Sequence, residues 1–259
     1  SCLHDGAFIP GADRYASRVS PEGVRRNITP GGGLWLPRNL AGRAALGARR
    51  QENEMLKAQP LNCTLKRDDS TPSSTDAMIA VLAREFSALG VEVADTIRLA
   101  AHNVPAGVTS DEGDGDEWPA IRERILAADI LIFGTPIWMG QASSVAKRAM
   151  ERMDAFLSET DDQGRMPSYS KVAVAAIVGN EDGAHFASAQ IFQALNDVGW
   201  TIPAVGACYW VGEAMGSKDF QDLDKTPEPV AKTAQMVAGN AAHLAQLFAA
   251  NPFPGQGVA

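Results

Sequence analysis

Residues 127–144 read AADILIFGTPIWMGQASS, and this stretch decides the fold. Its first part, Ile130 to Phe133, is a short continuous apolar run, which is typical of a strand buried on both faces of a parallel sheet. Its second part, 134–143, contains a proline, a tryptophan and a glycine, and it predicts a loop before a helix that begins at Ser143 or Ser144. Because open α/β sheets bind ligands beyond the carboxyl ends of their strands, we expect a binding site at this loop.

From residue 55 onward, strand patterns alternate with helix patterns, which predicts a doubly wound parallel sheet of five strands in one domain. Pro60 and Lys57 make the first strand the weakest, since proline lacks an N–H for the ladder and lysine is unwelcome in a covered sheet. The predicted strands cover residues 55–62, 91–97, 130–133, 172–178 and 204–211. The predicted helices cover residues 75–89, 117–127, 144–157, 185–198 and a last helix with Thr226 as N-cap, Pro227 at N1 and an apolar stripe reaching Phe248.

Composition and charge exclude several classes of protein. The chain has 259 residues and a formal net charge of −8, so it offers no basic face to a nucleic acid or an anionic membrane. No apolar run approaches the roughly 20 residues that cross a bilayer. Cys2, Cys63 and Cys208 fit neither a disulfide framework nor a zinc site, and the simplest expectation is a reducing cytoplasm.

The ends of the chain differ from its middle. Residues 1–54 are rich in Gly, Pro and Arg and lack a sustained period, which predicts an irregular extension. The domain itself is expected to cover residues 55–250, with a C-terminal tail at 251–259.

Three loops that follow predicted strands, 63–75, 134–143 and 179–185, should converge at one edge of the sheet. The first is rich in hydroxyl groups and enters a helix, whose N-terminal N–H groups and dipole would bind a phosphate. The sequence lacks G-x-x-x-x-G-K-[ST], and it lacks G-x-G-x-x-G after its first strand. A phosphate monoester is therefore a better match than a nucleoside triphosphate or a conventional dinucleotide site.

The loop at 134–143 offers an aromatic side chain, and the loop at 179–185 offers backbone N–H donors. Trp138 is either a stacking partner for a flat ring or a residue that packs on a neighbouring helix or subunit. Gly183 permits close approach of the backbone to a ligand, whereas His185, at a helix start, is not assigned proton transfer. Tyr209, Trp210 and Glu213, after the fifth strand, either line the substrate side or pack against the 215–226 loop.

Three ordered motifs, at Leu61–Lys66 with Ser73–Thr75, at Gly134–Gln141 and at Gly179–His185, resemble the flavin loops of the NADPH-dependent FMN reductases of the flavodoxin superfamily. The resemblance covers about residues 55–250, whereas residues 1–54 have no counterpart in it. It implies a flavodoxin-like sheet with strand order 2-1-3-4-5 and helices on both faces. The flavin phosphate would lie at the first motif, the ring against the second, and its pyrimidine edge at the third. The implied FMN-binding residues are Thr64, Lys66, Ser73, Ser74, Thr75, Pro136, Ile137, Trp138, Met139, Gly140, Gln141, Gly179, Asn180, Glu181, Asp182 and Gly183.

The resemblance also implies an activity. A reduced nicotinamide, from NADPH or NADH, would pass hydride through bound FMN to a small acceptor such as a quinone or free flavin, without a catalytic acid, base or metal from the protein. The family often works as a homodimer or homotetramer. The main alternative is a flavodoxin-type electron carrier that shares the fold and FMN but does not turn over NAD(P)H. A phosphoacceptor receiver domain is set aside, because Asp129 lies at the wrong end of its strand.

Overall fold

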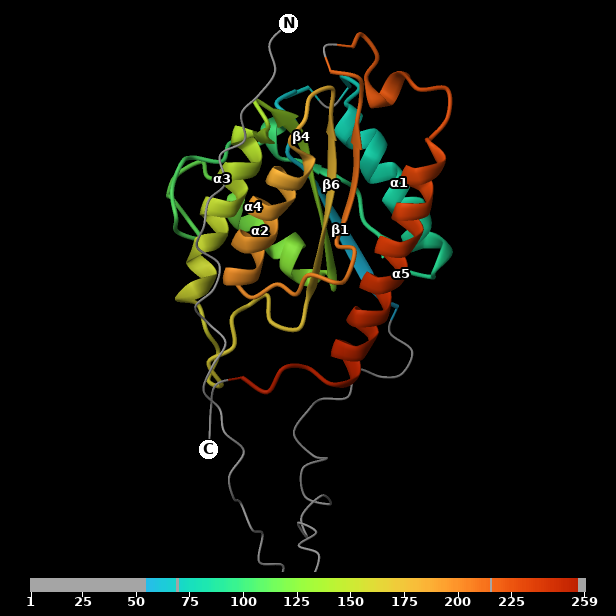
Figure 1. Ribbon diagram of the computed structural model, residues 1–259. Helices are drawn as coiled ribbons and strands as arrows, with labels where there is room; N and C mark the ends of the chain where they lie inside the picture. The colour runs from blue at the N-terminus through green and yellow to red at the C-terminus, as the bar shows by residue number, and fades with distance from the viewer. Residues whose placement is uncertain (1–54, 69, 215, 256–259) are drawn as a thin grey trace, which may run out of the picture. The chain divides into compact units, whose positions relative to one another are not determined.

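The computed structural model describes residues 55–68, 70–214 and 216–255 (Figure 1). The predicted extension at 1–54 and the last residues of the predicted tail, 256–259, lie outside the described residues. Among the described residues, no helix is both long and apolar enough to cross a membrane.

The fold is built on a seven-stranded sheet whose five main strands run parallel along the path β2-β1-β4-β6-β7. This path is the predicted order 2-1-3-4-5, and two further short strands, β3 and β5, pair with β1 and β4. The strands cover Lys57–Asn62 (β1), Glu92–Val93 (β2), Ile97–Arg98 (β3), Ile130–Trp138 (β4), Gln141–Ala142 (β5), Val172–Gly179 (β6) and Ala207–Val211 (β7).

Helices cover both faces of the sheet (Figure 1). Helices α1 and α5 lie on one face, and α2, α3 and α4 lie on the other. The α-helices cover Ser74–Ala88 (α1), Trp118–Ala127 (α2), Ser144–Met153 (α3), Ala184–Asp197 (α4) and Glu228–Ala250 (α5). Short 3₁₀ helices cover Leu99–Ala101 (η1), Asp154–Leu157 (η2) and Phe220–Asp222 (η3).

The central strands β4 and β6 explain why the sheet needs both layers. Successive residues of β4 alternate between two cores: Leu131 and Phe133 pack under α2–α4, whereas Ile130 and Ile132 pack under α1 and α5. Strand β6 is likewise buried along Val172–Val178. A continuous apolar run is stable only where both faces are covered, so the predicted burial of these strands is confirmed.

The prediction of one continuous strand over 91–97 was wrong, because the chain there forms β2 and β3 with a break between them. The N–H of Ala94 donates to the carbonyl oxygen of Ala58 at 2.9 Å. Because the backbone polar groups of alternate residues point to the same side of a strand, those of Pro60, like those of Ala58, point toward the segment 92–98. Proline has no N–H, so this ladder loses a bond at the break. The side-chain Nε2 of Gln59 donates instead to the Asp95 carbonyl oxygen at 2.9 Å.

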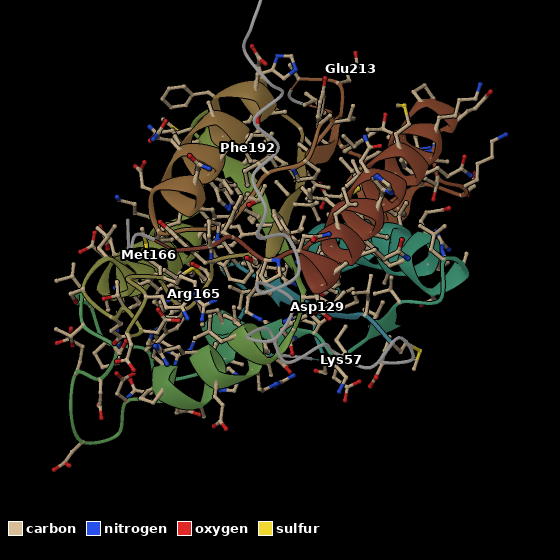
Figure 2. The ribbon with its side chains drawn as sticks, turned by 90° about the horizontal axis from the view of Figure 1, so that it is seen from below. Lys57, Asp129, Arg165, Met166, Phe192 and Glu213 are labelled. Atoms are coloured by element: carbon tan, nitrogen blue, oxygen red, sulfur yellow. The ribbon has the colours of Figure 1, made fainter. Side chains whose placement is uncertain are left out.

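Lys57 is accommodated because it stands exposed at the start of β1. Its backbone N–H donates to Asp129 Oδ2 at 2.9 Å. In Figure 2, which is seen from below, Lys57 and Asp129 lie next to each other at the amino ends of β1 and β4. The first strand therefore keeps its predicted place beside the third.

The prediction that 134–143 forms a loop was also wrong in part. Strand β4 continues to Trp138 and turns back into β5, with Trp138 paired to Gln141 in an antiparallel hairpin. Met139 and Gly140 form the turn, and both have positive φ, 53° and 74°. A two-residue turn of this kind matches the twist of the strands that it joins, so the segment is a rigid hairpin.

The predicted helices are present, with differences at their ends. Helix α3 begins at Ser144, and the Ser143 side chain caps it by accepting from the N–H of Ala146. The N-cap of α5 is Pro227 rather than the predicted Thr226, since Pro227 has an extended ψ of 139°. Pro229 then occupies the first turn, where its missing N–H needs no acceptor. The predicted helix at 144–157 ends at Met153 and continues as the 3₁₀ helix η2.

Candidate functional site

A cavity of about 360 Å³ opens at the carboxyl ends of β1, β4 and β6, where the order of the strands reverses. This volume lies within the roughly 300–1,000 Å³ range of small-molecule pockets. Eleven of the predicted site residues line it: Thr64, Lys66, Ser73, Ser74, Thr75, Pro136, Ile137, Trp138, Gly179, Asn180 and Glu181. The lining also includes Leu65, Val178, Asp219 and Phe220, which were not predicted, and Trp210, for which a place near the substrate was one of two expected roles.

One end of the cavity is the N-terminus of α1. The Ser73 hydroxyl caps this helix by accepting from the N–H of Asp76 at 3.3 Å. Within the described residues, the N–H groups of Ser74 and Thr75 have no acceptor. Free N–H groups at a helix start, together with hydroxyls and the helix dipole, attract an anion. Lys66, also at this end, donates through Nζ to the Pro72 carbonyl oxygen at 2.5 Å.

Buried polar groups fix the loop that carries Thr64. Asn62 is fully buried at the end of β1, where its Oδ1 accepts from the N–H of Thr64 at 2.8 Å. Its Nδ2 donates to Asp76, which also forms an ion pair with Arg98. Arg98 in turn donates to the Thr71 carbonyl oxygen at 2.9 Å. Asn62, Asp76 and Arg98 therefore fix the hydroxyl-rich turn. Of these three residues, only Asn62 belongs to the motifs that resemble the flavin loops.

Aromatic side chains also line the cavity. Trp138 lies at the end of β4, and 54% of its surface is exposed. Trp210, on β7, contacts Phe220 with ring centroids 5.6 Å apart. Trp210 thus lines the cavity and also packs against the segment that carries Phe220, while its expected place on the substrate side stays a prediction.

The remaining predicted site residues lie beside the cavity and do not line it: Met139, Gly140, Gln141, Asp182 and Gly183. These residues make the contacts between the hairpin turn and the loop before α4. The N–H of Met139 donates to Glu181 Oε1 at 2.7 Å. A Cβ on Gly183 would stand 2.5 Å from the Gly140 carbonyl oxygen, so the two backbones are in close contact.

The missed residues Asp219 and Phe220 come from the segment between β7 and α5. Asn180 Nδ2 donates to Asp219 Oδ1 at 2.8 Å, and the N–H of Gln221 lies 3.4 Å from Ser74 Oγ. These contacts bring the segment against both the phosphate-like end and the third loop. No local pattern in 212–226 marks it, because its role comes only from contacts with residues far away in the sequence.

The polar side chains near the site do not form a nucleophile and base pair. His185 Nε2 lies 3.1 Å from the Tyr209 hydroxyl, and neither residue lines the cavity. Cys63 is fully buried under the loop, and burial raises the pKa of its thiol far above the ordinary range, so it stays protonated. Across the described residues, no cluster of three or more His, Cys, Asp or Glu side chains could hold a metal ion.

Comparisons with known proteins agree with this geometry. The sequence model of the NADPH-dependent FMN reductase family matches residues 63–215. Among curated proteins, 8-demethyl-8-aminoriboflavin-5′-phosphate synthase of Streptomyces davaonensis is 30% identical over 208 residues, which is 76% of this chain and 80% of that protein. The divalent metal cation transporter MntH of Mycobacterium bovis is 34% identical over 202 residues, 75% of this chain. The chain spans only 29% of the length of that transporter.

Solved structures agree as well. The crystal structure of RosB with the bound intermediate 8-demethyl-8-formylriboflavin-5′-phosphate superposes with a TM-score of 0.69 at 29% identity, over 78% of this chain and 83% of that chain. A flavone reductase superposes with a TM-score of 0.53 at 15% identity, over 74% of this chain and 63% of that chain, a likeness of fold alone.

Proposed function

The chain belongs to the NADPH-dependent FMN reductase family, and we propose that it is an FMN-dependent oxidoreductase that passes hydride from NADPH or NADH to a small acceptor. The observation that carries this proposal is the mixed lining of the cavity at the strand-order reversal. The N-terminus of α1 and the loop before it present hydroxyls and free backbone N–H groups, and aromatic and apolar side chains line other parts of the cavity. A singly phosphorylated molecule with a flat ring combines the same two kinds of surface.

The phosphate end suits the phosphate of FMN, the flavin of this family. Ser74 and Thr75 offer N–H groups, and Thr64, Ser73, Ser74 and Thr75 offer hydroxyls. Lys66 adds a positive charge beside them. Hydrogen bonds between neutral donors and an ionised phosphate are about twice as strong as neutral ones, so this end can anchor the cofactor without a metal.

The ring end would orient the flavin. Pro136, Ile137 and Trp138 form one wall on the rigid hairpin, and Trp210 and Phe220 add apolar surface beside Ser74 at the start of α1. Gly179, Asn180 and Glu181, at the carboxyl end of β6, would face the polar edge of the ring. The five predicted residues that do not line the cavity, Met139, Gly140, Gln141, Asp182 and Gly183, would act indirectly, because their mutual contacts fix the hairpin that carries Trp138.

Bound FMN supplies the hydride chemistry itself, so the protein needs no acid or base of its own. Its own residues bind the phosphate, fix the ring between the hairpin and the Trp210 side, and leave the exposed face of Trp138 at the entrance. A small acceptor such as a quinone or free flavin would use that entrance after the nicotinamide leaves.

An absorption spectrum followed by rapid mixing tests the proposal. The purified full chain supplied with FMN should show flavin bands near ~450 nm, and mixing with NADPH without oxygen should bleach them. Ser74→Glu should weaken FMN binding, because it places a carboxylate among the phosphate donors, whereas Ser87→Glu at the far end of α1 is the matched control. Flavin binding without bleaching by NADPH or NADH would refute the reductase and favour the electron carrier.

A second candidate function comes from the relatives. The synthase from Streptomyces davaonensis is named for a flavin phosphate product, and RosB holds a modified riboflavin phosphate as an intermediate. In this chain the flavin phosphate would then be the substrate and not the cofactor. Mass spectrometry separates the two after incubation of the protein and FMN with oxygen as the oxidant and an amino-acid amine as the nitrogen donor. An altered flavin mass supports modification, whereas unchanged FMN after many NAD(P)H turnovers supports the reductase.

The proposal extends to assembly and location. We expect one domain over residues 55–250, a cytoplasmic location, and a homodimer or homotetramer. Exposed apolar side chains at the site edge, Trp138, Met139 and Phe186, support a subunit contact there, since such groups are usually covered. Light scattering of the purified protein gives the subunit number, and a monomer at micromolar concentration would contradict the assembly.

A further inference from the structure

A second cavity, of about 330 Å³, lies beside the first and shares Leu65 with it. It is formed by the loop after β1, the 3₁₀ helix η1 and the start of α3. Arg67, His102 and Arg148 line it together with Asn103 and Ser144. We call it the Arg67–Arg148 cavity.

The charges around this cavity are mainly positive. Arg148 lines the cavity, and its Nη1 donates to the Val104 carbonyl oxygen at 2.8 Å, which holds the guanidinium in place. No partner of Arg67 is found in the part of the chain that the structure describes. His102 Nδ1 lies 2.9 Å from Glu117 Oε1. Within residues 55–68, 70–214 and 216–255, no ion pair joins the guanidinium of Arg67 or of Arg148 to a carboxylate.

The walls between these charges are apolar. Leu99 and Val104 are buried, and Leu65 and Val145 complete a surface on which a flat ring can lie. The cavity is much larger than an isolated phosphate needs, and its volume falls at the lower end of the range for small organic ligands. Arginine pairs are well suited to phosphate, because the planar guanidinium offers parallel donors to two oxygens.

We propose that the Arg67–Arg148 cavity binds the phosphate-bearing adenosine half of the reduced nicotinamide nucleotide. This inference rests on the proposed function, and it assigns a place to the part of the donor that does not react. The nicotinamide would reach the flavin cavity across Leu65, which lines both spaces. A phosphate monoester on the ribose would lie between the two guanidiniums, and the adenine would lie against Leu99 and Val104. Such a site favours NADPH over NADH.

Binding of a fragment of NADPH that lacks the nicotinamide tests the proposed site without enzyme turnover. Adenosine 2′,5′-bisphosphate is titrated into the FMN-loaded full chain by calorimetry. Arg67→Ala and Arg148→Lys should each weaken its binding by about tenfold, since each loses one charge-assisted pair with the phosphate. Lys147→Ala is the control: it removes a neighbouring positive charge on the same helix, but Lys147 does not line the cavity and pairs with Glu151 at 3.6 Å.

The outcomes are separable. The proposal is supported if the two arginine variants lose binding, Lys147→Ala does not, and FMN affinity stays the same in all three. It is overturned if the wild-type chain does not bind the fragment, if the arginine variants bind as tightly as wild type, or if inorganic phosphate competes at the same concentration as the fragment. Failure of NADPH and NADH to bleach the flavin would instead refute the proposed function, and the fragment titration still decides the cavity.

Discussion

Gly183 is the most informative single position, because the hairpin that carries Trp138 packs directly on it. Its φ is +131°, and an added Cβ would lie 2.5 Å from the carbonyl oxygen and 2.6 Å from the Cα of Gly140. Both atoms belong to the backbone, so no side-chain rotation relieves the clash. Gly183→Ala must therefore displace the turn at Met139 and Gly140.

The magnitude follows from two contributions. A non-glycine residue at positive φ costs about 1–3 kcal/mol, and forcing extra volume into close packing adds about 1–3 kcal/mol. Gly113→Ala is the matched control, because Gly113 also has positive φ, +100°, but nothing lies within 4 Å of an added Cβ. Gly183→Ala should thus lower the free energy of unfolding by about 1–3 kcal/mol more than Gly113→Ala.

Urea unfolding followed by circular dichroism measures this difference, and fluorescence titration measures FMN binding. Because Gly183 supports the hairpin wall of the site, Gly183→Ala should also weaken FMN binding, whereas Gly113→Ala should leave it unchanged. Equal loss of stability in the two variants would refute the close contact between Gly140 and Gly183. Loss of stability with unchanged FMN affinity would refute the role of the hairpin in the flavin site.

Other predictions concern buried ionisable groups. Asp116 and Arg152 form an ion pair at 2.6 Å with both side chains fully buried, so Asp116→Ala should lower the free energy of unfolding by about 3–5 kcal/mol in chemical denaturation. Burial alone would raise the pKa of Asp116, but hydrogen bonds from Arg152 and from backbone N–H groups outweigh it and keep the pKa below its ordinary value. The contribution of Asp116 to stability is therefore complete above the unfolded pKa of about 3.9 and is lost as pH falls through the lower folded pKa. Asp116→Asn should make the free energy of unfolding depend less on pH in this acid range, and an unchanged dependence would contradict the assignment. Burial raises the pKa of Cys63 and brings that of Cys208 to about 12, so in a Cys2→Ser background a thiol reagent at pH 8 should label the protein only after unfolding.

Local patterns determined much of the fold. The apolar runs of β4 and β6 required a sheet covered on both faces, and the start of α3 at Ser144 agrees with the prediction of a helix beginning at Ser143 or Ser144. The strand order and the convergence of three loops at one edge followed once the chain was recognised as flavodoxin-like. The strand and helix patterns depend on residues close together in the sequence, where periodicity and turn chemistry act directly, whereas the strand order rests on the resemblance.

Only the tertiary structure decided the rest. The split of the second strand depends on which neighbour Pro60 faces, and the hairpin at 134–143 depends on Gly183 meeting Gly140. The wall made by Trp210 and Phe220 depends on a segment that reaches Ser74 across 147 residues of sequence. Such contacts leave no local signature, because their energy exists only when the folded sheet has brought both partners to the same place.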